Sequence, residues 1–328
     1  MRRLFPLYIV LLALLGSCRS GGTEQEPMDL LGTVPWQREE WDRCARELEE
    51  HLGPESRESQ MGALDAAFYD IMFRDGAMAD YLVQDKGPQQ LLVQGNNYLC
   101  LPSTLTFTVK DGAAVAGLFT LHVSGTDVNA DGSLDSGDQV SMDFTGESAG
   151  LQFLASPVQM NGGTASATVR FLSDGYQLAQ LSLSSADFRF DPASFFLGVT
   201  QLTLALPGGI CIRGSIEGTR LWNALRVLTD MVPEQEAQEA IREASAAMQL
   251  SVYYGDQPNL ARATLDMGPY HILNRYDDYW TWTLLIHTAD GSTLGLADFF
   301  SAQAFSNLLK DSSAFIQAWQ ALMPHLLS

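Results

Sequence analysis

The densest group of side chains that could do chemistry in this sequence lies in residues 127–138. Carboxylate or amide oxygens occupy the first, third, fifth, ninth and twelfth positions of this stretch, Gly132 the sixth and Leu134 the eighth. Hard divalent cations prefer about six to eight oxygen ligands, and one loop of this length can wrap them around a single ion. The backbone carbonyl of Ser133 would add a further oxygen. The side-chain donors would be Asp127, Asn129, Asp131, Asp135 and Asp138.

This spacing resembles the calcium loop of EF-hands and, more closely, that of dockerin modules. The resemblance implies a bound Ca²⁺ held by the oxygens named above. Two features differ from the EF-hand pattern: Asp138 replaces the longer glutamate, and the flanking residues 118–124 and 139–145 alternate as strands do. We therefore expect only the ion site to carry over, in a structural role between two strands. The alternative is an acidic, solvated hairpin loop, because Asn, Asp and Gly are good turn residues.

A second motif, residues 146–150, reads Gly-Glu-Ser-Ala-Gly and matches G-x-S-x-G. It resembles the nucleophile elbow of carboxylesterases, in which a strained strand-to-helix turn exposes the serine. Here the alternation continues through residues 151–155, so the sequence favours a hairpin turn at Ser148 over a helix start. The remaining members of a catalytic triad would come from His271, His287 and Asp277.

A third group combines aromatic rings with carboxylates near residues 270–282. Rings can stack on sugar faces while acids accept hydroxyl hydrogens, which makes this group a candidate glycan platform. The alternative is that Trp280, Trp282 and Leu284 pack into the core from one strand face, with the tyrosines at its rim. The candidate ligand-binding residues are Tyr276, Asp277, Asp278, Tyr279 and Trp280.

The N-terminus carries a targeting pattern. Arg2 and Arg3 precede an apolar run that ends in Leu15-Gly16-Ser17-Cys18. This tetrapeptide resembles the lipobox of bacterial lipoproteins, which implies a signal peptide over 1–17 and lipidation of Cys18. The Gly- and Glu-containing stretch that follows has little periodicity, which predicts a flexible tether over 18–34. The run is too short to span a bilayer comfortably. Position 19 is Arg and not the Asp that resembles an inner-membrane retention signal, so an outer-membrane location is expected. The alternatives to a lipoprotein signal are an ordinary cleaved signal peptide and a retained anchor.

Charge and cysteine content limit the classes of partner. The formal net charge is -20, from 19 Lys and Arg against 39 Asp and Glu. Such a chain repels polyanions, which excludes general nucleic-acid binding and disfavours electrostatic docking to anionic lipid. Cys44, Cys100 and Cys211 remain after lipidation, and the sequence leaves open whether Cys100 pairs with Cys211 or all three are small buried residues.

Periodicity predicts an α+β fold. Two helices are expected within residues 35–75, the first with Trp41, Cys44, Leu48 and Leu52 on one face, the second over 61–72. Alternation from about 90 to 217 predicts an antiparallel β meander of eight or nine strands, a curled sheet or open barrel. The expected turns lie at Asp111-Gly112, Gly162-Gly163, Asp174-Gly175 and Gly208-Gly209.

Helical spacing returns in residues 218–328. Helices are expected from Leu221 and Pro233, strands over 250–254 and 280–287, and two amphipathic helices near the C-terminus. We expect the N- and C-terminal helices to cover the apolar sheet face and residues 35–328 to form a single α+β domain. The C-terminal helices would carry Phe299, Phe300, Phe305 and Leu308, and then Phe315, Trp319 and Leu322.

Together these features predict a lipid-anchored bacterial envelope protein without enzymatic activity, which binds an apolar or glycan ligand or a partner protein. An envelope hydrolase of ester or glycan substrates is one alternative, and a surface adhesin or assembly subunit is another. Whether the chain itself covers the apolar side of the sheet distinguishes binding of a partner protein from binding of an apolar ligand. A side filled by the chain's own helices favours a partner protein, and an open side lined by Phe and Leu favours an apolar ligand.

Overall fold

The structure is a computed structural model. It describes residues 35–53, 82–86, 89–94, 97–102, 104–111, 114–126, 139–161, 163–186, 188–190, 195–228, 232–255, 259–273, 278–288, 291–295, 304–308, 310–312 and 315. The expected signal peptide, tether, calcium loop and helix over 61–72 lie outside these residues.

The chain divides into two compact units. Unit 1 comprises residues 47–183 and 303–328, and unit 2 comprises residues 2–46 and 184–302. The expectation of a single folding domain over residues 35–328 stays a prediction.

Helix α2 (Pro35–Leu52) forms as expected, with its residues divided between the two units. Its predicted apolar face is buried: Trp41, Cys44, Leu48 and Leu52 are at most 3% exposed. The helix ends at Gly53, which adopts a φ of 90° and donates its N–H to the Glu49 carbonyl at 2.9 Å. Glycine reaches this left-handed conformation without strain, which explains the stop.

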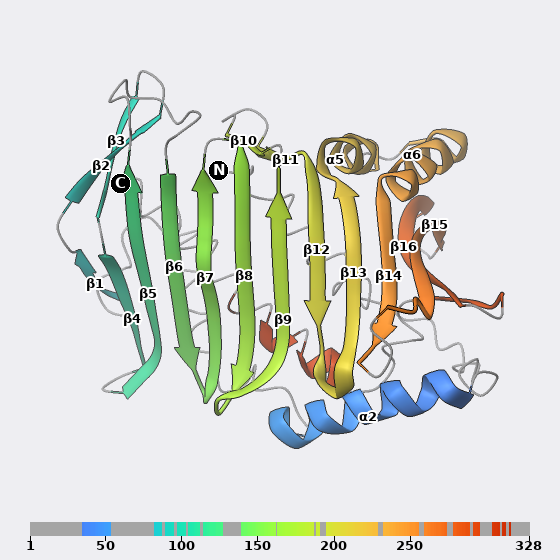
Figure 1. Ribbon diagram of the computed structural model, residues 1–328, viewed down its shortest axis with the longest axis horizontal. Helices are drawn as coiled ribbons and strands as arrows, with labels where there is room; N and C mark the ends of the chain where they lie inside the picture. The colour runs from blue at the N-terminus through green and yellow to red at the C-terminus, as the bar shows by residue number, and fades with distance from the viewer. Residues whose placement is uncertain are drawn as a thin grey trace. The chain divides into compact units, whose positions relative to one another are not determined.

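Unit 1 is an antiparallel meander (Figure 1). Its strands follow the order β1-β4-β5-β6-β7-β8-β9, and β2 and β3 form a separate two-stranded sheet. The order does not close on itself. The strands are β1 (Leu82–Lys86), β2 (Gln89–Gln94), β3 (Asn97–Pro102), β4 (Thr104–Asp111), β5 (Ala114–Thr126), β6 (Gln139–Ser148), β7 (Leu151–Asn161), β8 (Thr164–Ser173) and β9 (Tyr176–Ser185).

Tight turns join these strands where the sequence predicted them. Asp111 pairs with Ala114, and Asn161 pairs with Thr164, so both hairpins have two-residue connections. Asp174 and Gly175 connect β8 to β9 with φ values of 48° and 84°. Positive φ at both central residues is the signature of a type I′ turn, whose twist matches that of the flanking strands.

The core of unit 1 lies on one face of the meander and is aromatic. It contains Phe107, Phe119, Phe144, Phe153 and Phe171, all at most 7% exposed. The C-terminal segment, helical at residues 304–308 and 310–312, buries Phe305, Leu308 and Phe315, and the Phe315 ring lies against this face.

Unit 2 contains a second run of antiparallel strands with two helices. Its strands follow the order β12-β13-β14-β15-β16-β17, and β10 pairs with β11 in a small separate sheet. The elements are β10 (Phe188–Phe190), β11 (Phe195–Leu197), β12 (Val199–Ala205), β13 (Ile210–Glu217), α5 (Gly218–Val227), α6 (Glu234–Ala246), β14 (Met248–Tyr254), β15 (Ala263–Leu273), β16 (Asp278–Thr288) and β17 (Thr293–Gly295).

The helices of unit 2 lie at opposite ends of its strands. In Figure 1, α5 and α6 lie at one end of β12–β14, and the unit-2 part of α2 lies at the other. At that second end the Arg43 guanidinium donates to the Gly208 carbonyl at 2.5 Å, in the turn between β12 and β13.

The structure confirms the predicted fold class: α+β, an open antiparallel meander packed against N- and C-terminal helices. The helices expected from Leu221 and Pro233 correspond to α5 and α6. The count of eight or nine strands was too low, because β2 and β3 carry consecutive apolar residues instead of an alternation and β11 has only three residues. Strand β15 was missed because Gly268 and Pro269 interrupt its pattern.

Candidate binding groove

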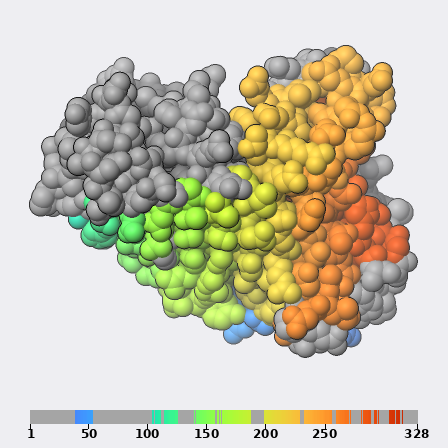
Figure 2. Space-filling model, turned by 45° about the horizontal axis from the view of Figure 1, so that its top comes forward, coloured from blue at the N-terminus to red at the C-terminus, as the bar shows by residue number. Residues whose placement is uncertain are grey.

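A groove of about 740 Å³ lies in unit 2 between α5, α6 and the first residues of β12. The six residues that connect the two helices bring them side by side, as short connections do in helical hairpins. In Figure 2 the two helices form a raised, gold-coloured block above the strands of the same unit.

Small apolar side chains on facing surfaces hold the two helices together. Helix α5 buries Leu221, Ala224 and Leu225, and α6 buries Ala237, Ala240, Ile241 and Ala244. Alanines at the contact allow the helix axes to approach closely, since the distance between packed helices depends on the side chains between them.

Two backbone hydrogen bonds fix the start of α5 at the end of the groove. The Glu217 N–H donates to the Ala247 carbonyl at 2.8 Å, and the Gly218 N–H donates to the Gly198 carbonyl at 3.1 Å. Glu217 also pairs with Val199 in the register of β13 and β12. The groove is therefore anchored to the sheet of unit 2.

The floor of the groove is apolar. Ala224 and Val227 of α5 and Ala240 of α6 line it, and Val199 of β12 lies at its end. Val199 is 46% exposed, which makes it one of the few large apolar side chains with that much exposure among the described residues. Val199 thus adds an exposed apolar side chain at one end of a groove whose alanines are largely buried.

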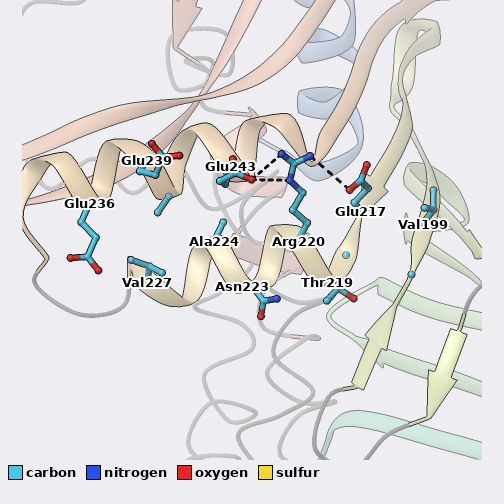
Figure 3. Close-up of a pocket in the computed structure, with 13 residues that line it drawn as sticks. Val199, Glu217, Thr219, Arg220, Asn223, Ala224, Val227, Glu236, Glu239 and Glu243 are labelled. Carbon is cyan, nitrogen blue, oxygen red and sulfur yellow. Dashed lines mark hydrogen bonds and ion pairs between the residues drawn. The ribbon is translucent and has the colours of Figure 1, made fainter.

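The rim of the groove is acidic. Its charged residues are Glu217, Glu236, Glu239, Glu243 and Arg220, four acids against one base. Arg220 donates from Nε and Nη2 to one Glu243 oxygen at 3.0 and 2.8 Å, and its Nη1 lies 3.9 Å from the Glu217 carboxylate. Figure 3 shows this group in the middle of the groove and towards its β12 end, with Glu236 and Val227 at the other end.

Part of this acidity has a structural explanation. Glu234 and Glu236 lie in the first turn of α6, where carboxylates interact favourably with the positive end of the helix dipole. Glu239 forms an ion pair with Arg242. No ion pair of Glu236 occurs among the residues that the structure describes.

The structure does not describe the predicted calcium ligands, Asp127, Asn129, Asp131, Ser133, Asp135 and Asp138. It does describe the strands on both sides of them. Thr126 at the end of β5 pairs with Gln139 at the start of β6, so residues 127–138 connect two hydrogen-bonded strands. Among the described residues, no cluster of three or more His, Cys, Asp or Glu side chains could hold a metal.

Ser148 lies in a hairpin, as its sequence context predicted. The residue is 6% exposed, and its hydroxyl donates to the Ala116 carbonyl at 2.8 Å. Ala149 and Gly150 form a turn with φ values of 50° and 77°. A Cβ at Gly146 would lie 2.9 Å from the Phe119 ring and 3.1 Å from Phe315, so this glycine makes room for the aromatic core.

The aromatic group near residue 280 is only partly described. Tyr276 and Asp277 lie outside the described residues, and Asp278 and Tyr279 are placed only as backbone positions of β16. Trp280 on β16 is half-buried and stacks on His271, with which it pairs on the neighbouring strand β15. The two ring centroids are 4.5 Å apart. Trp282 is also half-buried, and Leu284 is buried. Burial on this face of β16 therefore increases from Trp280 to Leu284.

The structure describes the side chains of both histidines of the candidate triad and of two of the cysteines. His271 is exposed in its stack with Trp280, and His287 lies 3.6 Å from the Asp266 carboxylate. Cys44 is buried in α2, and the Cys211 thiol forms no disulfide. Burial raises the pKa of Cys211, and the nearby Arg213 charge lowers it in part. Cys100 is placed only as a backbone position of β3.

The groove itself was not predicted from the sequence. The signal available was the row of alanines in α6 opposite Ala224, beside acids at helical spacing. Such a row is equally typical of a solvated surface helix, and only the packing of α5 on α6 distinguishes the two.

Comparison with known proteins gives no match: no family model, no curated protein and no solved structure corresponds to this chain. Among the described residues, no helix is both long and apolar enough to cross a bilayer.

Proposed function

We propose that this protein is an exported, non-enzymatic envelope protein, anchored by lipid at Cys18, that binds a partner protein. The pattern at residues 2–18 supports export and anchoring. The placement that this pattern favours is the outer membrane, on its periplasmic or exposed face.

The observation that carries the partner-binding function is the filled apolar face of unit 1. Phe315 is fully buried, and its ring centroid lies 6.2, 6.2 and 5.8 Å from those of Phe119, Phe153 and Phe171. The chain's own C-terminal segment thus occupies the place that an apolar ligand would take. A filled face favours recognition through the outer surface.

A structural calcium ion is part of this proposal. The pairing of Thr126 with Gln139 brings together the two ends of residues 127–138, which would help their oxygens to surround one ion. The ion would neutralise clustered carboxylates and stabilise the folded chain by mass action.

The buried position of Ser148 argues against the hydrolase alternative at this motif. Its hydroxyl donates to a backbone carbonyl and is withdrawn from solvent. A nucleophile must reach its substrate and receive help from an adjacent base.

Binding of a fluorescent long-chain fatty acid tests the choice between a partner protein and an apolar ligand. We expect no saturable binding to the full chain, because Phe315 fills the aromatic face. Phe315→Ala should gain probe uptake and lose about 3–5 kcal/mol of unfolding free energy.

The matched control is Leu221→Ala, which truncates a buried side chain of unit 2. It should lose stability without gaining uptake. Saturable, stoichiometric binding of the fatty acid by the unaltered chain would refute the partner-binding proposal in favour of an apolar ligand.

A further inference from the structure

The groove between α5 and α6 combines an apolar floor with an acidic rim. Its floor consists of small apolar side chains, Ala224, Val227 and Ala240, and Val199 adds a larger exposed one at the β12 end. Small floor residues let the backbone of an incoming helix approach, as the alanines already do between α5 and α6.

The rim determines the sign of the occupant's charge. Four glutamates and one arginine line the groove, which gives a formal charge of -4 + 1 = -3. Both neighbours of Arg220 are carboxylates, Glu243 at 2.8 Å and Glu217 at 3.9 Å, so its charge is compensated within the groove. The carboxylates of Glu236 and Glu239 are exposed on the same helix, where Arg242 offsets the charge of Glu239 and Glu236 adds an exposed acid.

We infer that this groove binds a basic amphipathic helix of the partner protein, with its apolar stripe on the alanine floor and its lysines or arginines against the glutamates. The inference rests on the proposed partner-binding function and specifies the chemistry of the partner. Helix-in-groove recognition uses anchors at helical spacing. From Glu236 to Glu243, α6 rises about 10 Å, or two turns, which a short helix can match.

Charge complementarity alone would also attract small cations, and the two cases differ in the apolar contact. A basic helix requires Val199 and the alanine floor, whereas a polyamine requires only the carboxylates. Electrostatic attraction of either kind weakens with salt, so ionic strength does not separate them.

The test is binding of a labelled peptide of about 14 residues with leucines at helical spacing and lysines beside them. The full chain is used in mild detergent. We expect binding of this peptide, and none of its counterpart with glutamate in place of each lysine. The double variant Glu236→Gln, Glu239→Gln should bind about five- to tenfold more weakly at low salt.

The control Glu49→Gln, Glu50→Gln removes the same charge from exposed positions of α2 and should change the Kd less than about twofold. Val199→Ser should also weaken binding, because it removes the exposed apolar anchor. Equal losses of peptide affinity in the two double variants would overturn the inference. Unchanged peptide binding by Val199→Ser, together with displacement of the peptide by spermidine, would overturn it as well.

Failure here is distinguishable from failure of the proposed function. If the peptide does not bind and the fatty acid does not bind either, this docking site is wrong while partner binding by another surface stands. If the fatty acid binds saturably, the proposed function falls whatever the peptide does.

Discussion

At the scale of single residues, burial controls the ionisation of Tyr254 at the end of β14. The side chain is 3% exposed, and burial raises its pKa to about 12. The nearby Trp41 side chain on α2 lowers the pKa in part, the Glu40 carboxylate raises it, and the Arg262 charge lowers it. Tyr254 is thus a core residue that must stay protonated where α2 packs.

A raised phenol pKa predicts a loss of stability in alkali. The unfolded phenol ionises near pH 10 and the folded one near 12, so its stabilising contribution is complete below pH 10 and is lost between these values. Between pH 9.5 and 11 the loss should be about 1 kcal/mol. Urea unfolding of the unaltered chain and of Tyr254→Phe measures it.

The Tyr254→Phe variant should lose correspondingly less stability over the same pH interval. An absorbance titration should show that this substitution removes a tyrosine that ionises near pH 12. Identical alkaline loss in both chains would mean that Tyr254 ionises in the folded state as it does in water.

At the scale of elements, hairpins were the most predictable feature. Turn residues and twofold alternation are local signals, and they located the connections at Asp174-Gly175 and after Ser148 correctly. The buried face of α2 was predictable for the same reason, because helical spacing fixes which side chains share a face.

Features that depend on contacts between distant segments were not predictable. The positioning of Phe315 over Phe119, Phe153 and Phe171 joins residues more than a hundred positions apart, and no local pattern specifies it. The groove depends likewise on how α5 packs on α6. Sequence periodicity identified the apolar faces and predicted that the terminal helices cover the sheet, but it did not specify which side chains meet there.

The hairpin between β5 and β6 gives the element-scale prediction for calcium. Millimolar Ca²⁺ should raise the melting temperature of the full chain by roughly 4–8 °C relative to chelator, if the ion contributes about 2 kcal/mol. The double variant Asp127→Ala, Asp131→Ala should abolish the rise, because it removes two of the predicted ligands.

The variant Glu49→Ala, Glu50→Ala serves as a control, since it deletes two exposed carboxylates of α2. It should keep the calcium-dependent rise. Superimposable melting curves of the unaltered chain in calcium and in chelator would refute the ion site.

At the scale of the whole molecule, the proposed placement rests on the N-terminal pattern and the proposed class of partner rests on net charge. A chain of formal charge -20 is unsuited to polyanions, and an anchored acidic protein is well suited to basic partners. The acidic groove and the filled aromatic face agree with that partner class. All of these inferences assume that the chain leaves the cytosol.

Mass spectrometry of the N-terminal peptide from the native host tests that assumption most directly. We predict that the mature chain begins at Cys18, with diacylglycerol in thioether linkage on the cysteine sulfur. The variant Cys18→Ser should keep the precursor N-terminus and lose the lipid. An unacylated native chain that still begins at Met1 would contradict the account.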